Sequence, residues 1–250
     1  MKFMACLTLC MASFLASSES LKIGLQPYDP PFSIQVGKNN LFSGFEAQLI
    51  ADICKRLHAN CTYIPMQFHD FFPQLIAQNI DLALGQISIT KERSRQFSFS
   101  IPYMISSGQL IIKNNSPITR AEELRGKKVG VFKASLYKEY LWKKFDKDIV
   151  ILEYDSSPSA LQALITDEVD AVLLSTIAEK YWVINNKLDM SDFHFIGNPI
   201  FLGNGYGIMA HLDSYELIHK INQIIIEMET DGTYLQLYNL YFGLVDSSSK

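Results

Sequence analysis

The sequence has no run of basic residues and no long apolar stretch beyond its first residues. Its 22 Lys and Arg are outnumbered by 26 Asp and Glu, so the formal net charge is -4. A nucleic-acid-binding surface normally needs a basic patch, and we therefore expect no nucleic-acid partner. After residue 15, no apolar segment approaches the length of a membrane-spanning helix. The 250 residues are expected to form a globular protein with one large core or two modest ones.

Motifs of hydrolytic and metal chemistry are also missing. No Gly-x-Ser-x-Gly sequence occurs, and the five His are scattered, so a Ser-His-Asp triad has no support. No His residues have the spacing of metal ligands. We expect no catalytic residue, no bound metal and no cofactor.

The first residues have the pattern of an export signal. Lys2 forms a short basic region, residues 3–15 are mostly apolar, and residues 16–18 are small. We expect a signal peptide over residues 1–18, a mature chain that starts near residues 19–21, and a location in the periplasm. A lipid anchor on Cys10 is disfavoured, because Leu9 is bulky where lipoprotein processing requires a small residue.

The four cysteines fall into two pairs. Cys6 and Cys10 would leave with the signal peptide, whereas Cys54 and Cys61 would stay in the mature chain. Two cysteines this close in an exported protein are expected to form a disulfide bond. A pair of buried thiols is the alternative, and a metal site is less favoured because His58 is the single extra ligand nearby.

Short apolar strands alternate with amphipathic helices in two successive series. The first series predicts strands at residues 21–25, 62–66 and 81–87, with helices at residues 46–57 and from Pro73 onward. The second series predicts strands at residues 127–132, 149–153 and 170–174, with helices after Ser135 and around residues 161–165. A long apolar helical face over residues 217–228 follows near the end.

This alternation is typical of α/β units with mainly parallel sheets. Two series indicate two lobes, and a single uninterrupted sheet is the alternative. The extended, Gly-containing stretches Gly108–Ile112 and Asn204–Ile208 could connect the lobes.

A polar turn follows the strand predicted at residues 81–87. Ser88 and Thr90 lead into a predicted helix that Thr90 caps, and Arg93 lies one turn inside it. Helix N-termini favour anions, and Arg binds a carboxylate through two parallel hydrogen bonds. The segment therefore predicts a carboxylate site in which Arg93 has no structural partner. The alternative is an ordinary strand-turn-helix with a solvated Arg.

Short motifs follow one another in a definite order through the mature chain. They are Ile23-Gly24 with Pro30-Pro31-Phe32, Gly44-Phe45-Glu46, the segments 87–93, 99–103, 124–131 and 169–172, Asp231-Gly232-Thr233, and Tyr241-Phe242-Gly243. Together they resemble the periplasmic solute-binding proteins of polar amino-acid ABC transporters. The Cys54–Cys61 pair matches a bridge of the basic-amino-acid members.

The resemblance implies the type II periplasmic binding protein fold. This fold is α/β, with two lobes joined by two crossover strands that close on a ligand in the cleft. Residues 19–108 and 208–250 would form lobe 1, and residues 109–207 would form lobe 2.

The resemblance also implies a set of ligand-binding residues. Arg93 would bind the ligand α-carboxylate together with Ser88 and Ser135, while Gly85 and Gln86 would line the amino-group side. The same comparison places Phe68 and Phe132 as aromatic walls of the cleft, although core packing is the alternative for both.

Three further positions depart from the family pattern. Gln26 stands where an acidic residue is common, and Asp29 stands nearby where an aromatic residue is common. Ser175 stands where a carboxylate normally pairs with the ligand ammonium. A buried ammonium without a countercharge is costly. Either Asp29, Asp70 or Glu46 replaces the missing carboxylate, or the ligand has no α-amino group.

The expected function is delivery of an amino acid, or a related small carboxylated solute, to the membrane permease of an ABC importer. The protein would act as a monomer. The alternative is a periplasmic, dehydratase-like enzyme on the same scaffold, which needs a general acid over its substrate. Glu46, Asp70 and Glu179 are the available carboxylates, and none lies in a recognisable catalytic motif.

Overall fold

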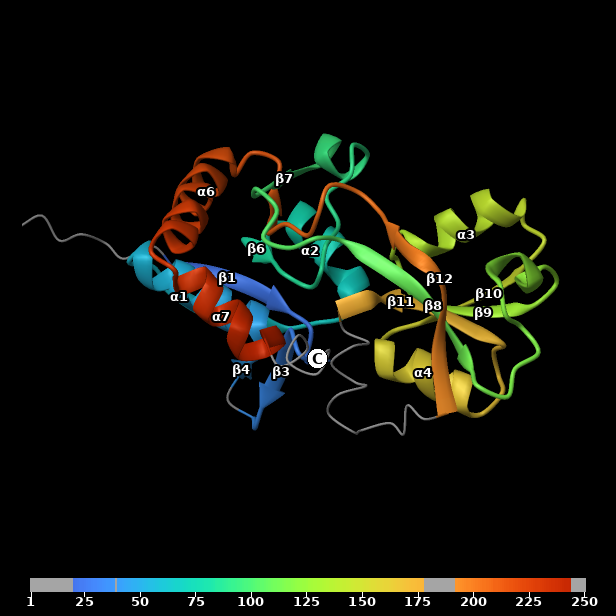
Figure 1. Cartoon of the computed structure of the whole chain (residues 1–250). Coiled ribbons are helices and arrows are strands. Elements are labelled where there is room, and N and C mark those ends of the chain that lie inside the picture. Colours follow the sequence, from blue (N-terminus) through green and yellow to red (C-terminus); the bar gives the residue numbers. More distant parts are fainter. Residues whose placement is uncertain (1–19, 39, 178–191, 244–250) are drawn as a thin grey trace, which may run out of the picture.

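The computed structural model describes residues 20–38, 40–177 and 192–243. The predicted signal peptide and Glu179 lie outside these ranges. Two five-stranded sheets lie next to each other, each with helices packed on it (Figure 1). The first lobe is built on the sheet β5-β1-β6-β13-β7, and the second lobe on the sheet β10-β9-β11-β8-β12. The predicted two-lobed α/β fold is therefore confirmed, and the single-sheet alternative is wrong.

The first lobe contains the strands β1 (Ser20–Leu25), β5 (Asn60–Pro65), β6 (Leu82–Ala83), β7 (Phe97–Phe99) and β13 (Met209–His211). Its helices are α1 (Phe45–Arg56), α2 (Phe71–Ile76), α6 (Tyr215–Thr230) and α7 (Thr233–Phe242), with the 3-10 turns η1 (Phe68–Asp70) and η2 (Arg93–Arg95). A small antiparallel sheet consists of β2 (Tyr28–Asp29), β3 (Ser33–Val36) and β4 (Leu41–Ser43).

The second lobe contains the strands β8 (Ser107–Lys113), β9 (Lys128–Phe132), β10 (Val150–Tyr154), β11 (Ala171–Ser175) and β12 (Phe193–Phe201). Its helices are α3 (Tyr137–Phe145) and α4 (Ser157–Ile165), with the 3-10 turn η3 (Ala121–Leu124).

In helix α1 the apolar residues of the sequence pattern form the face that packs into the core. Leu49, Ile50 and Ile53 recur at helical spacing, and all three are fully buried in the core of the first lobe. The helix begins after Gly44, whose φ is +119°. A Cβ at this position would lie 2.4 Å from the carbonyl oxygen of Phe32, so the turn into the helix requires glycine.

Both sheets are mixed, whereas the alternation of strands and helices predicts mainly parallel ones. Strand β1 pairs in parallel with β5 and β6, and β9 pairs in parallel with β10 and β11. The antiparallel members are β13 in the first lobe and β8 in the second. Each of these two strands enters its sheet directly from the other lobe, so its direction is not set by a strand-helix-strand unit of its own lobe.

Two extended segments connect the lobes, namely the first crossover (residues 100–106) and the second crossover (residues 202–208). They lie side by side, because Met104 and Tyr206 form an antiparallel bridge (Figure 1). The predicted connection at Gly108–Ile112 is wrong. This stretch belongs to β8 and is paired on both sides, by β11 and by β12. Its consecutive apolar residues Leu110, Ile111 and Ile112 are all buried, because core clusters cover both faces of the strand.

Cys54 in α1 and Cys61 in β5 form a disulfide bond, as predicted, with their Cα atoms 6.3 Å apart. The bond joins the end of a helix to the following strand. No helix within the described residues is long and apolar enough to cross a membrane.

Candidate ligand-binding site

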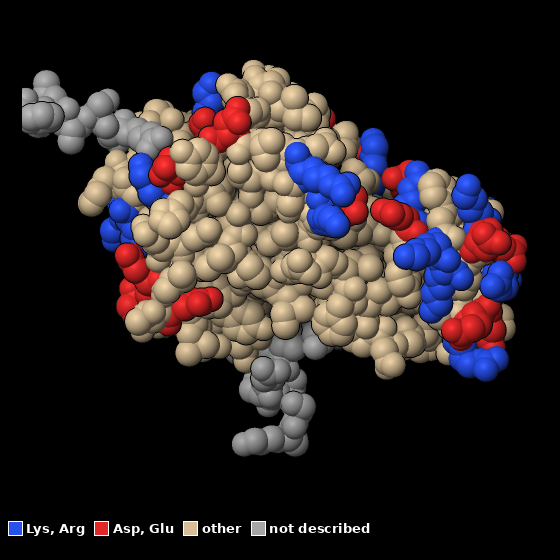
Figure 2. All heavy atoms as spheres, turned by 90° about the horizontal axis from the view of Figure 1, so that it is seen from above, with Lys and Arg blue, Asp and Glu red and all other residues tan. Residues whose placement is uncertain are grey.

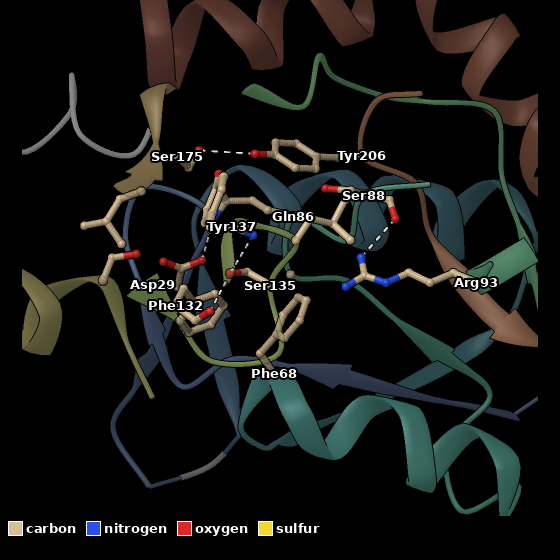
Figure 3. Close-up of a pocket in the computed structure, with 14 residues that line it drawn as sticks. Asp29, Phe68, Gln86, Ser88, Arg93, Phe132, Ser135, Tyr137, Ser175 and Tyr206 are labelled. Atoms are coloured by element: carbon tan, nitrogen blue, oxygen red, sulfur yellow. Dashed lines mark hydrogen bonds between the residues drawn. The ribbon is translucent and has the colours of Figure 1, made fainter. Parts of the chain in front are cut away.

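A pocket lies where the two lobes face each other, and both lobes contribute to its walls (Figure 3). Its first-lobe residues are Asp29, Phe68, Gly85, Gln86, Ser88 and Arg93. The second lobe contributes Phe132, Ser135, Leu136, Tyr137, Ser157, Leu174 and Ser175, and the second crossover contributes Tyr206. Nine of the ten predicted ligand-binding residues are thus brought together; Gln26 is not among the lining residues.

Arg93 supplies the positive charge of the pocket. Its guanidinium donates hydrogen bonds to the carbonyl oxygen of Ser88 at 3.0 Å and, across the cleft, to that of Ala134 at 3.1 Å. It also lies over the rings of Phe68 and Phe72, 5.9 and 5.1 Å from their centroids. Burial lowers the pKa of Arg93 to about 10, so the group remains charged at neutral pH.

Two expectations about Arg93 are wrong in detail. The helix predicted after Thr90 is the single 3-10 turn η2, because β7 already begins at Phe97. The N-cap of this turn is Glu92 and not Thr90, although the Thr90 hydroxyl accepts the backbone N–H of Arg93 at 3.1 Å. Arg93 also has structural partners, namely the two carbonyl oxygens. No described carboxylate forms an ion pair with it, however.

Asp29 supplies the acidic group of the pocket. It follows the turn after β1, and only 5% of its surface is exposed. Its Oδ2 accepts hydrogen bonds from the side-chain amides of Gln86 at 2.6 Å and Gln26 at 3.0 Å. Burial raises the pKa of Asp29 to about 7, although the bonds from Gln86 and Gln26 oppose this rise. Gln26 therefore lies behind Asp29 and orients it.

The other two candidate carboxylates do not line the pocket. Asp70 lies at the surface beside His69, with their side chains 3.6 Å apart. Glu46 is fully buried behind the pocket. Its Oε1 accepts the backbone N–H of Gln86 at 2.7 Å and the hydroxyl of Tyr103. Burial raises the pKa of Glu46 to about 8, opposed by these hydrogen bonds and increased further by the charge of Asp29.

The predicted aromatic walls meet across the cleft. The rings of Phe68 and Phe132 are 5.1 Å apart at a tilt of 59°, and they come from different lobes. Phe68 also contacts Phe71 and Phe72. The pair thus packs in an apolar cluster and lines the pocket at the same time, so both alternatives considered for these rings apply.

Hydroxyl groups form the remaining polar wall. Ser88 Oγ is 2.8 Å from Ser106 Oγ, and Ser135 Oγ donates to the carbonyl oxygen of Phe132 at 2.5 Å. Ser175 Oγ accepts a hydrogen bond from the hydroxyl of Tyr206 at 3.4 Å. Position 175, where the resemblance expects a carboxylate, is therefore neutral and buried in the wall.

Several residues that line the pocket were not predicted from the sequence. Tyr137 and Tyr206 line the pocket with Leu136, Ser157 and Leu174. Tyr206 lies in the predicted crossover Asn204–Ile208, and Tyr137 follows Ser135 by two positions. Their proximity to predicted features was the only available signal, because an isolated Tyr has no characteristic spacing. Among the described residues, no cluster of His, Cys, Asp and Glu could hold a metal ion.

A cleft between two α/β lobes, with a guanidinium that no described acid neutralises and a carboxyl group at one small pocket, is typical of a receptor for a small solute. Residues 21–244 match the family of bacterial extracellular solute-binding proteins, family 3. The match spans most of the chain, and the chain belongs to this family.

Relatives of this chain include named amino-acid-binding proteins. It is 29% identical over 241 residues to the "ABC transporter arginine-binding protein 1" of Escherichia coli (strain K12), covering 94% of this chain and 98% of that protein. It is also 29% identical over 226 residues to the "L-cystine-binding protein TcyJ" of the same strain, covering 90% and 83%.

Solved structures of amino-acid-binding proteins are also similar to this chain. An "arginine 3rd transport system periplasmic binding protein" from Legionella pneumophila is 39% identical with a TM-score of 0.83, covering 90% of this chain and all of that one. An ancestral arginine-binding protein, solved with bound glutamine, is 32% identical with a TM-score of 0.80, covering 91% and 99%. These relationships identify the chain as a periplasmic solute-binding protein of the ABC-transporter type.

Proposed function

We propose that this protein binds an amino acid, or a related small carboxylated solute, that carries a positively charged group, and delivers it to the membrane permease of an ABC importer. One observation carries the proposal. Arg93 and Asp29 lie on opposite sides of the same pocket, where they match the two charges of such a ligand (Figure 3). The ligand carboxylate binds Arg93 beside Ser88 and Ser135, and its positively charged group binds Asp29.

Asp29 replaces the carboxylate that is missing at Ser175. It is the single acidic residue among the described residues that line the pocket. Gln86 lines the same side, and its side-chain oxygen is buried without a hydrogen-bond partner in the described structure. An N–H group of the ligand would satisfy this oxygen. The distal part of the pocket therefore favours a nitrogen-rich group, such as the guanidinium or ammonium of a basic amino acid.

A transport receptor is favoured over an enzyme, and a monomeric state is part of the proposal. Asp29 is held by two amides instead of facing a nucleophile or a base. The named relatives with extensive coverage are transport proteins. The surface seen in Figure 2 carries both signs of charge in small groups, without a basic patch for nucleic acid.

A thermal-shift and calorimetry panel tests the proposal. Arginine, lysine, ornithine, histidine, glutamine, cystine and glutamate would each be added to the purified mature protein. Specific binding stabilises the native state by mass action, by about 2.7 kcal/mol at a ligand concentration one hundred times the Kd. We expect the largest shift from a basic amino acid, recovered chemically unchanged. A response to glutamate alone would contradict the role of Asp29, and conversion of a ligand to a product would favour the enzyme alternative.

A further inference from the structure

Two carboxyl groups are buried next to the pocket without a cationic partner. Asp29 is 5% exposed and Glu46 is fully buried. Neither forms an ion pair with any residue in the described ranges. Burying one unpaired carboxylate is costly, and burying two beside each other is more so, because their charges repel.

One residue connects the two acids. Gln86 donates its backbone N–H to Glu46 Oε1 at 2.7 Å and its side-chain N–H to Asp29 Oδ2 at 2.6 Å. It does so with a φ of +53°, a conformation that a residue other than glycine rarely adopts. The two hydrogen bonds fix Gln86 between the acids, so the charge of one acid is sensed by the other.

Two atoms in this group lack a hydrogen-bond partner within the part of the chain that the structure describes. They are Glu46 Oε2 and Gln86 Oε1, both fully buried. A buried acceptor without a donor is unfavourable. A proton on Glu46 Oε2 would turn this atom into a donor. Gln86 Oε1 belongs to a residue of the pocket wall, where an N–H group of a ligand could donate to it.

The surroundings do not supply a compensating charge. Tyr103 and Tyr206, from the two crossovers, face the acids with neutral hydroxyls, and Tyr234 of α7 donates its hydroxyl to the carbonyl oxygen of Tyr103. The cation of the pocket, Arg93, lies on the far side from Asp29 (Figure 3). Burial raises the pKa of Asp29 to about 7 and that of Glu46 to about 8.

We propose that Asp29 and Glu46, joined by Gln86, form one proton-holding unit that loses a proton from Asp29 when a ligand with a positively charged group binds there. The inference rests on the proposed function. In the empty pocket just below neutral pH each of the two carboxyls keeps a proton that a surface carboxyl would have lost. When the cation arrives, the proton on the Asp29 carboxyl leaves for the solvent and an ion pair forms in its place, while Glu46 stays protonated.

Glu46 is a positioning residue in this scheme. It does not line the pocket, and it acts through Gln86, whose backbone N–H it accepts and whose side chain donates to Asp29. The sign of the pH dependence follows from linkage. Because the empty site binds more protons than the occupied one, affinity for a cationic ligand falls as the pH decreases below about 7. The expected slope is about tenfold per pH unit for one proton.

Calorimetry with L-arginine measures the proton directly. Titrations at pH 6 in phosphate and in a buffer of larger ionisation enthalpy give the number of protons released per bound ligand. We expect about one proton for L-arginine. L-citrulline has nearly the same shape but an uncharged end group, and it should release none through that group, so the difference between the two ligands is the quantity of interest.

Substitutions separate the roles of Asp29 and Glu46. Asp29→Asn should lose both the proton release and most of the affinity for L-arginine. Glu46→Ala removes the acceptor for the Gln86 backbone and weakens the bond from Gln86 that opposes the raised pKa of Asp29, so it should move the pH at which affinity begins to fall to a higher value. Glu46→Gln keeps that acceptor and should stay close to the wild type. Tyr103→Phe removes the hydroxyl that helps to hold the Glu46 side chain beside Gln86. It should move this pH in the same direction by less, and it serves if Glu46→Ala does not fold. Asp70→Asn changes an acid outside the pocket and should leave the profile as in the wild type.

The outcomes are distinguishable. L-arginine binding without proton exchange, or a pH profile that none of the Glu46 and Tyr103 variants moves, would overturn the proton-holding unit and leave the proposed function intact. Failure of every cationic amino acid to bind would overturn both.

Discussion

Replacing Arg93 by Ala tests the carboxylate site most directly. The guanidinium lies in the pocket wall, and no described acid neutralises it. A bound ligand carboxylate would gain two charge-assisted hydrogen bonds from it. Truncating one partner of such a buried pair typically costs about 2–5 kcal/mol, which corresponds to a loss of roughly 30-fold to several-thousandfold in affinity. Arg93→Lys keeps the charge without the fork and should fall between Ala and wild type.

The same substitution should also lower the stability of the protein, by a smaller amount. Arg93→Ala removes hydrogen bonds to the carbonyl oxygens of Ser88 and Ala134 and the contact with the Phe72 ring. Arg93 is partly exposed, so we expect a loss of about 1–2 kcal/mol, or roughly 2–8 °C in Tm. Calorimetric titration with L-arginine and a melting curve on one sample measure both effects.

Arg95 provides a matched control, because it lies in the same turn η2 and is exposed outside the pocket. Arg95→Ala should change neither affinity nor Tm appreciably. The carboxylate site would be refuted by wild-type affinity in Arg93→Ala. A fall in Tm with affinity intact would mean that Arg93 serves the structure alone, by joining the two lobes through Ala134.

Two further predictions concern the disulfide and the motion of the lobes. Replacing Cys54 and Cys61 by Ser should lower the free energy of unfolding by about 2 kcal/mol, because the bond closes a short loop and restricts the unfolded chain. Calorimetry should show unchanged affinity, because neither cysteine lines the pocket. A variant that melts like the wild type would contradict this. Ligand binding should reduce the radius of gyration in small-angle scattering, with bending at residues 100–106 and 202–208. An unchanged radius at saturating ligand would count against this motion.

Most elements of the fold follow from apolar periodicity, although the strand predicted at residues 81–87 is only β6 at Leu82–Ala83. The helix predicted at residues 46–57 is α1 at Phe45–Arg56, and the strand predicted at residues 127–132 is β9 at Lys128–Phe132. These segments bury one face in a lobe core, so their pattern is imposed by packing. The crossovers could not be located in the same way. Strand β8 and the first crossover are both extended and apolar, and only tertiary pairing separates them.

The charges of the site were only partly predictable. Arg93, Ser88 and Gln86 follow one another along the chain, and their spacing indicates a shared site. Glu46 lies 40 residues before Gln86 and meets it through a backbone hydrogen bond, which leaves no trace in residue spacing. Gln26 illustrates the opposite error. Its position in the sequence suggested a ligand contact, but its amide is used to hold Asp29.

The distribution of charge between the lobes gives a reason for the departure at position 175. Both charged groups of the pocket, Arg93 and Asp29, come from the first lobe, whereas the described second-lobe residues that line it are all neutral. On the proposed function, a ligand with two opposite charges would be held by the first lobe before the cleft closes. The second lobe would then add the Phe132 ring and the Ser135 hydroxyl, and it supplies a carbonyl for Arg93. A carboxylate at Ser175 would place a second negative charge in the same pocket, and its repulsion with Asp29 would oppose closure.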